Sequence, residues 1–149
     1  MRAAAEIVVD RPLEVVWRWA ADPRNWENWQ EGVRDVRVHG RLVEGGRIAS
    51  RYEYGGHVHD FEYELVLRDP PRRQLVRSLA GPFPFESELV LSEHARGTLV
   101  RQSVDAGPDG RFTAFLYVAG GPFLRYGLRR RIKAQLRRLK DAIELTGVR

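Results

Sequence analysis

The chain has 149 residues, of which 43% are hydrophobic and 30% charged, and its formal net charge is +5. This composition is that of an ordinary globular protein rather than a disordered one, and the absence of cysteine excludes disulfides and thiolate chemistry. The length fits one domain over residues 1–149, and no apolar run approaches the ~18 residues of a membrane span. We therefore expect a single soluble, cytoplasmic domain that is monomeric or homodimeric.

The first part of the chain predicts one strand followed by two short helices. Residues 4–10 are rich in Ile and Val, as strands are. Pro12 suits the first turn of a helix, and Asp22-Pro23 ends that helix. Trp26 and Trp29 are three residues apart, which predicts a second short helix before the sheet continues.

From Val33 onward, apolar and charged residues alternate with a period of two, which predicts six further strands in an antiparallel meander. The turns between them are marked by glycine and proline: Glu44-Gly45-Gly46, Gly55-Gly56, Asp69-Pro70-Pro71, Gly81-Pro82 and Ala95-Arg96-Gly97. Each predicted strand has one apolar and one charged face. The sheet is therefore expected to pack one face against helices and to leave the other in water.

Residues 110–146 predict a long amphipathic helix. Its apolar positions recur at spacings of three and four, namely Leu128, Ile132, Leu136, Leu139 and Ile143. Basic residues fall between them, namely Arg129, Arg130, Lys133, Arg137, Arg138 and Lys140. We interpret this basic face as a solvated outer surface, with weak contact to an anionic membrane as the alternative. No aromatic residues interleave with the arginines, so we expect no nucleic-acid partner.

Motifs spread over nearly the whole chain form one set: Ile7-Val8-Val9-Asp10-Arg11-Pro12, Val15-Val16-Trp17, Asp22-Pro23, Asn25-Trp26, Trp29, Asp69-Pro70-Pro71, Gly97-Thr98 and Arg137-Arg138-Leu139-Lys140. This set resembles the START-like (SRPBCC) superfamily, and within it the polyketide cyclase/dehydrase and lipid-transport group. The resemblance implies an α+β helix-grip (Bet v 1-like) fold, in which a curved seven-stranded antiparallel sheet wraps around the C-terminal helix. It also implies a deep, largely apolar cavity between them, but this superfamily hosts many functions.

Strand parity supplies candidate residues for the lining of that cavity. The ligand-binding candidates are Trp26, Trp29, Tyr52, Tyr54, Phe61, Tyr63, Phe85, Ser87, Gln102, Phe115, Phe123 and Tyr126; Leu89, Val100 and Val104 share the inward parity. Trp26 and Trp29 are expected at the cavity mouth, as in proteins that the chain resembles, and the alternative is that they anchor their helix to the sheet. Such a lining suits a hydrophobic or aromatic small molecule, and the alternative is that the aromatic rings fill the space themselves.

Signals for catalysis and metal binding are sparse. His57 and His59 share one strand face without a third ligand nearby, so we expect no metal and no cofactor. The polyketide cyclases that the chain resembles use an inward arginine near the end of the central strand. The matching inward positions here are predicted to be Leu65 and Leu67, with Arg68 out of phase. Tyr63, Arg77 and His59 are the substitute catalytic candidates, on the premise that Arg77 shares the inward parity of its strand.

Three functions are consistent with these patterns. We favour the binding of a hydrophobic or aromatic small molecule in the cavity. The second is a polyketide aromatase/cyclase or dehydratase that acts on a poly-carbonyl chain with acid and base groups of the cavity and no metal. The third is a peripheral lipid or quinone carrier whose basic helix face docks on anionic lipid.

Overall fold

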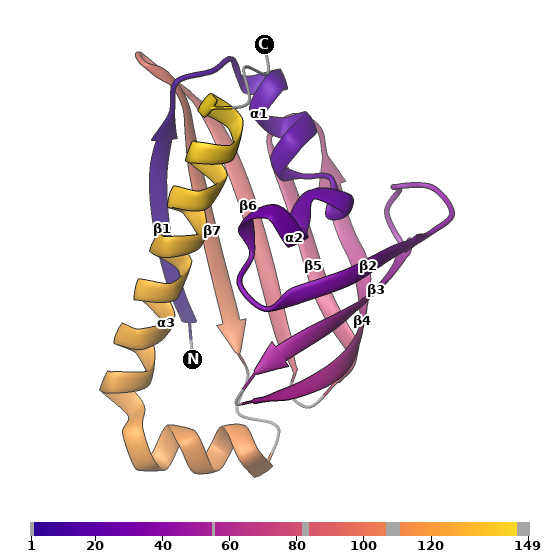
Figure 1. The fold of residues 1–149 in the computed structure, drawn as a ribbon, viewed down its shortest axis with the longest axis vertical. Coiled ribbons are helices and arrows are strands. Elements are labelled where there is room, and N and C mark those ends of the chain that lie inside the picture. The colour runs from indigo at the N-terminus through magenta and orange to yellow at the C-terminus, as the bar shows by residue number, and fades with distance from the viewer. Residues whose placement is uncertain (1, 55, 82–83, 107–110, 146–149) are drawn as a thin grey trace.

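Seven antiparallel strands form one sheet in the order β1-β7-β6-β5-β4-β3-β2 (Figure 1). The computed structural model describes residues 2–54, 56–81, 84–106 and 111–145, with side chains throughout these ranges except at positions 54 and 111–124. The strands are β1 (Arg2–Val9), β2 (Val33–His39), β3 (Arg47–Tyr54), β4 (His57–Asp69), β5 (Arg73–Ala80), β6 (Phe85–His94) and β7 (Gly97–Ala106). The predicted α+β class with a seven-stranded antiparallel sheet is confirmed.

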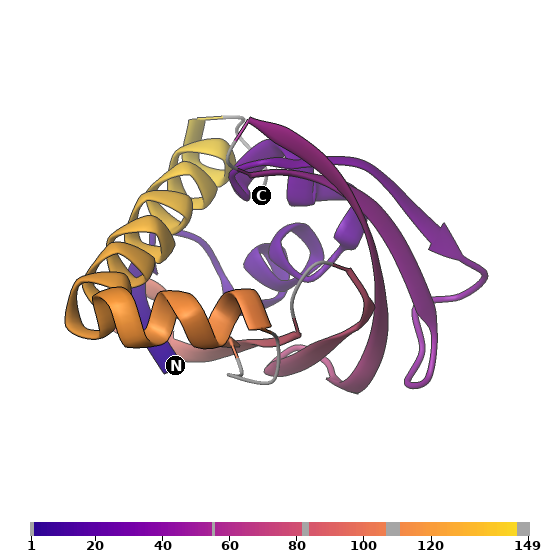
Figure 2. The same cartoon turned by 90° about the horizontal axis from the view of Figure 1, so that it is seen from below.

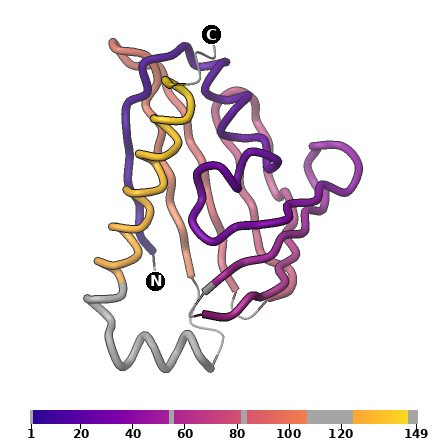
Figure 3. The backbone as a smooth tube through the Cα atoms, viewed as in Figure 1, coloured from indigo at the N-terminus to yellow at the C-terminus, as the bar shows by residue number. Residues whose placement is uncertain are grey.

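The helices lie on one side of this sheet. They are α1 (Leu13–Ala20), the 3₁₀ turn η1 (Pro23–Asn25), α2 (Trp26–Trp29) and α3 (Arg111–Leu145). Figure 2 shows the sheet curling around α1 and α2, with α3 at the edge formed by β1. The tube in Figure 3 shows that β1 and the C-terminal part of α3 run side by side, although they come from opposite ends of the chain. Within the described residues, no helix combines the length and apolar character that a membrane crossing requires.

Three irregularities in register shape the sheet. Between β2 and β3 the pairing shifts after Arg34, and between β4 and β5 it shifts on both sides of Glu64. In β4, Leu65 pairs with Val76 while Leu67 pairs with Leu75, so Val66 is an extra, bulged residue. A bulge bends and twists its strand and reverses the alternation beyond it. Side chains after Val66 therefore face the opposite side from the one that simple parity assigns.

The C-terminal half of α3 buries the apolar stripe that its sequence predicts. Ile132, Leu136, Leu139 and Ile143 are each at most 1% exposed, and they belong to one core together with residues of the concave sheet face and of α1 and α2. Burial of four such side chains contributes on the order of 6–12 kcal/mol before chain entropy is counted. Isolated helices are only marginally stable in water. Packing of this apolar face against the sheet therefore stabilises α3.

Polar contacts fasten the end of α3 to the segment between β1 and α1. The Lys140 ammonium donates to the Val8 carbonyl at 3.0 Å and to Glu144 Oε1 at 2.6 Å. The Asp10 backbone N–H also donates to Glu144 Oε1, at 2.9 Å, and the Arg11 guanidinium donates to the Glu144 carbonyl at 2.8 Å. These bonds satisfy carbonyl and amide groups at the helix end and at the strand end together.

Gly97, at the start of β7, is expected to tolerate no side chain. Its φ is +130°, and a Cβ there would overlap the Val9 carbonyl oxygen and lie 2.9 Å from the Arg11 nitrogen. We predict that Gly97→Ala lowers the free energy of unfolding by at least about 2 kcal/mol, because it adds a backbone clash to the strain of positive φ. Denaturant unfolding measures this loss.

Gly40 provides the matched control. It also has a positive φ, +78°, but nothing lies within 4 Å of a Cβ built there. Gly40→Ala should therefore lose only the conformational part, about 1 kcal/mol. Equal losses in the two variants would show that the Gly97 environment relaxes around a methyl group.

Candidate ligand-binding site

Aromatic side chains from several elements meet on the concave face of the sheet. The Phe61 and Tyr63 rings of β4 stack with their centroids 5.7 Å apart, and the Phe85 ring packs edge-on against Phe61 at 5.5 Å. Trp26 of α2 meets Tyr63 edge-on at 5.7 Å. Tyr52 of β3 meets Phe61 in the same way at 5.7 Å. These pairs have the geometries that the ring quadrupoles favour, so the cluster is a rigid apolar surface.

The centre of this cluster is closed by its own side chains. Phe61 is 1% exposed and Tyr63 4%, and Trp29 beneath α2 is 1% exposed. Phe85 and Tyr52 are half-buried. Trp26 and Trp29 therefore pack against the sheet as part of the core, and they anchor α2 to it. The Trp29 indole N–H has no hydrogen-bond partner among the described residues.

A pair of hydroxyl groups is buried beside the aromatic rings. The Tyr63 hydroxyl and Ser50 Oγ share a hydrogen bond of 2.8 Å, and Ser50 is 2% exposed. Burial raises the pKa of Tyr63 to about 12, although the Ser50 hydrogen bond acts in the opposite direction. Tyr63 is thus protonated at neutral pH, so it is able to donate a hydrogen bond but is not a general base.

A second polar group is buried on β7 and is only partly satisfied. Gln102 is 3% exposed, and its Nε2 donates to Ser87 Oγ over a long 3.4 Å. Its Oε1 has no partner in the described part of the chain. The cross-strand neighbours of Gln102 are Ala5 on β1 and Leu89 on β6, so the amide stands between a methyl group and an apolar side chain. A buried polar atom without a partner costs about 1–3 kcal/mol.

Arg68 lies on the concave face, which corrects the prediction that it is out of phase. The bulge at Val66 turns it inward, where it donates to Gln74 Oε1 at 2.5 Å and to the Ala21 carbonyl at 3.4 Å. Its guanidinium also lies 5.3 Å from the Trp17 ring centroid. Burial lowers the pKa of Arg68, and the nearby Asp22 carboxylate opposes this. The arginine therefore holds the C-terminal end of α1, where a cation also complements the helix dipole.

Arg77 does not reach inward, so its prediction as a cavity residue is wrong. Its strand pairs Val76 with Leu65 on the concave side, which leaves Arg77 on the outer face. There its Nε donates to Glu86 Oε1 at 2.7 Å, with about half of the side chain exposed. Arg77 is a solvated ion-paired residue.

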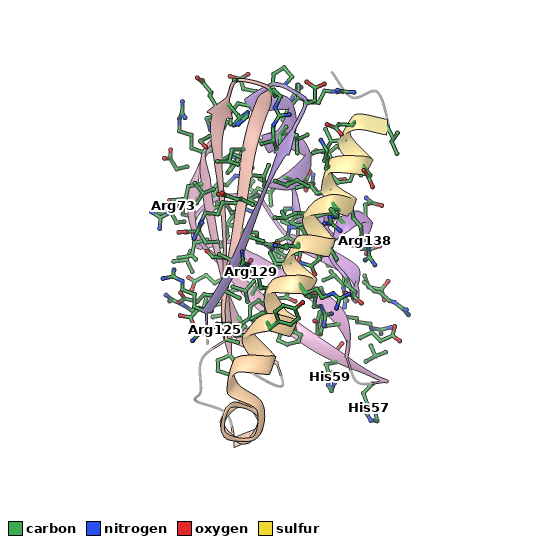
Figure 4. The ribbon with its side chains drawn as sticks, turned by 90° about the vertical axis from the view of Figure 1, so that its left-hand side faces the viewer. His57, His59, Arg73, Arg125, Arg129 and Arg138 are labelled. Carbon is green, nitrogen blue, oxygen red and sulfur yellow. The ribbon has the colours of Figure 1, made fainter. Side chains whose placement is uncertain are left out.

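The remaining predicted site residues are scattered. Tyr126 is 67% exposed on α3, so it does not line a cavity, because it stands on the outer side of the helix from the buried stripe. His57 and His59 lie near the β3–β4 turn with ring centroids 6.3 Å apart (Figure 4). Within the described residues no three metal-ligating side chains come together. The side chains of Tyr54, Phe115 and Phe123 lie outside the described residues.

An open groove of about 680 Å³, which sequence reasoning missed, lies beside α2 where α3 passes the ends of β2 and β3. Its walls are mostly polar: Glu27, Gln30, Glu31, Gly32, Val33, Arg34, Glu53, Gly56, Arg131 and Arg138. Arg131 donates to the Glu31 carbonyl at 3.2 Å and lies 5.4 Å from the Tyr52 ring centroid. Tyr52 thus connects the groove with the aromatic cluster. No sequence signal joins Glu31 to Arg131, because the fold alone brings them together.

Comparison with known proteins agrees with this architecture. A family model described as polyketide cyclase/dehydrase and lipid transport matches residues 1–144. No curated protein matches the chain in sequence. The solved structure of TTHA0849 from Thermus thermophilus is similar, with a TM-score of 0.77 and 19% identity over 99% of both chains.

Two further solved structures are similar to the chain. A START superfamily protein from Mycobacterium smegmatis has a TM-score of 0.77 and 12% identity, covering 97% of this chain and 98% of that one. DynU16, from the dynemicin biosynthetic locus, has a TM-score of 0.68 and 19% identity, covering 99% of this chain and 48% of that one. At such identities the likeness shows the fold alone.

The buried hydroxyl of Tyr63 should appear in the pH dependence of stability. Its folded-state pKa of about 12 lies above the ~10 of an unfolded tyrosine, so the associated stability is complete below pH ~10 and is lost as the pH rises toward 12. We predict that the free energy of unfolding falls more steeply between about pH 10 and pH 12 in the wild type than in Tyr63→Phe. Parallel curves from denaturant titrations would contradict this assignment.

The inward position of Arg68 should contribute measurably to the free energy of unfolding. The Arg68 guanidinium lies over the Trp17 ring while its Nη1 bonds both Gln74 and Ala21. Lysine lacks this flat group, so Arg68→Lys should cost about 1–2 kcal/mol. Arg77→Lys is the matched control on the outer face, where an exposed ion pair is worth roughly 0.5 kcal/mol or less. If thermal or denaturant unfolding shows equal effects for both, Arg68 does not anchor α1.

Proposed function

The chain belongs to the polyketide cyclase/dehydrase and lipid transport family, and from that premise we propose that it binds a hydrophobic or aromatic small molecule between its concave sheet face and α3. The aromatic cluster of β4 and Phe85 supplies one rigid apolar wall. Small and half-buried side chains continue this face toward β1, where Ala3 and Ala5 stand opposite Val104 and Gln102. This mixture of apolar surface and few polar groups is typical of small-molecule sites.

The observation on which the proposal depends most is the unsatisfied Gln102 amide. Folding places this polar side chain among apolar neighbours, 3% exposed, with Oε1 unpartnered among the described residues. Buried polar groups are nearly always paired, and an exception calls for a physical reason such as a missing partner. A hydroxyl group on the ligand suits this place, because a hydroxyl both donates and accepts and so satisfies either end of an amide. We infer an apolar or aromatic ligand with at least one hydroxyl-type group.

A polyketide cyclase is the second candidate, and the Ser50–Tyr63 pair favours it. Tyr63 stays protonated and buried, so its hydroxyl is a suitable donor to a ligand carbonyl. Arg68 does face inward at the end of β4, but Gln74 and the Ala21 carbonyl already accept its hydrogen bonds. His59 remains the candidate base for this alternative. A cyclase would lose turnover without losing binding in Tyr63→Phe, whereas a pure binder would show no turnover at any stage.

Native mass spectrometry of the purified protein, followed by thermal-shift screening with aromatic polyketides, fatty acids and quinones, tests the proposal. We expect at least one class to co-purify or to stabilise the fold, since a ligand at about 100 times its Kd adds about 2.7 kcal/mol to stability. The stabilising class also distinguishes a quinone or lipid carrier from a cyclase. A panel without any stabilising compound would favour a cavity that its own side chains fill.

Gln102→Leu gives the sharper test, because it changes stability and binding in opposite directions. Leucine removes the orphaned amide, so the unliganded variant should be at least as stable as the wild type. Binding of a hydroxyl-bearing ligand should weaken by about five- to a hundredfold. Arg77→Ala, on the outer face, is the control that should keep full affinity. A Gln102→Leu protein that is destabilised but binds normally would assign Gln102 a purely structural role.

A further inference from the structure

The net positive charge of the chain comes from one segment of α3. Seven of the 25 lysine and arginine residues lie between positions 125 and 138, and this segment contains no aspartate or glutamate. The remaining 18 basic residues are outnumbered by the 20 acidic residues of the chain. Charge is therefore distributed unevenly over the molecule: one helix segment is strongly cationic, and the rest of the protein is slightly acidic.

Several arginines of the sheet form ion pairs, whereas most basic residues of this helix segment do not within the described residues. On the sheet, Arg73 pairs with Glu88 at 2.6 Å, Arg101 with Glu6 at 3.9 Å and Arg51 with Asp35 at 3.4 Å. In the 125–138 segment only Arg131 has a carboxylate partner in the described part of the chain, Glu31 at 3.6 Å. The six others have none there: Arg125, Arg129, Arg130, Lys133, Arg137 and Arg138. All six are exposed.

These free cations form a continuous surface. Tyr126, Arg130, Lys133 and Arg137 follow one another at spacings of four, three and four, so they make one stripe opposite the buried side of the helix. We call these four residues the outer stripe. Arg125 and Arg129 lie on one side of α3 and Arg138 on the other (Figure 4). Arg138 also lines the groove beside α2, so the cationic surface reaches the groove.

We propose that the outer stripe of α3 docks the protein on an anionic lipid bilayer, with Tyr126 at the level of the headgroups. Each lysine or arginine near an anionic membrane surface contributes favourably, and exposed tyrosine is typical of the membrane–water boundary. Three unpaired cations and a 67% exposed tyrosine on a straight stripe fit a flat phosphate surface. The stripe contains no Asn, Gln or Ser to read base edges and one aromatic ring only, so it fits nucleic acid less well. This proposal does not depend on the identity of the cavity ligand.

Co-sedimentation with vesicles tests the docking surface. One set is pure phosphatidylcholine, and in the other about a third of the lipid is phosphatidylglycerol. We expect binding to the anionic vesicles alone, with a steep loss between about 50 and 200 mM salt. The triple variant Arg130→Gln, Lys133→Gln, Arg137→Gln should bind roughly a hundredfold more weakly. Tyr126→Ser should weaken the binding that persists at the higher salt.

The matched control is Arg51→Gln, Arg73→Gln, Arg101→Gln, which lowers the net charge by the same amount on the opposite, ion-paired face of the sheet. It should bind anionic vesicles within about threefold of the wild type. Circular dichroism and the thermal midpoint verify that both triple variants fold. Equal losses in the two triple variants would overturn the proposal, because net charge rather than the stripe would then be responsible. Failure to bind vesicles at low salt would overturn it too, as would stripe-dependent binding to a DNA duplex without vesicle binding.

Discussion

Burial of the apolar stripe of α3 against the β1 edge of the sheet is the constraint on which the rest of the molecule depends. Ile132, Leu136, Leu139 and Ile143 fit the core only if the helix runs along β1, and the bonds from Lys140 and Arg11 fix its end there. The middle of the concave face is then covered by α1 and α2 rather than by α3 (Figure 1). That division leaves the aromatic cluster beneath α2, where Trp26 packs on Tyr63, and it turns the basic side of α3 outward.

Periodicity was enough to predict the elements and much of the concave face. Alternation is clean along β6, β7 and the first half of β4, so the inward positions of Phe61, Gln102 and Ser87 follow from parity alone. Parity failed at Arg68, since one extra residue at Val66 reverses every side chain after it, and no composition marks a bulge in advance. It failed at Arg77 for a simpler reason: the inward set of β5 is Gln74 and Val76, which places Arg77 on the other face.

The features that sequence reasoning missed depend on contacts between distant segments. The groove beside α2 exists because Glu31 accepts from Arg131 and because the Glu31 amide donates to Gln135 across the chain. Gln102 Oε1 likewise has no partner among the described residues because its cross-strand neighbours are Ala5 and Leu89. Only the strand order shows that these two residues are its neighbours. The alternation of residues in the sequence thus places the candidate site on the concave face of the sheet. Only the packing of distant segments shows which polar group there has no partner within the described protein and is available to a ligand.

The pairing of β1 with β7 has a consequence for how the chain assembles. Arg2 lies opposite Asp105 and Val9 opposite Thr98, so β1, the first strand of this sheet in chain order, has no partner until the six other strands have followed it. The entropy cost of closing such a long loop must be met before the β1–β7 contacts can offset it. This topology is therefore slow to fold. Until then the β1 edge stays open to other chains, and the arrival of β7 and α3 covers it.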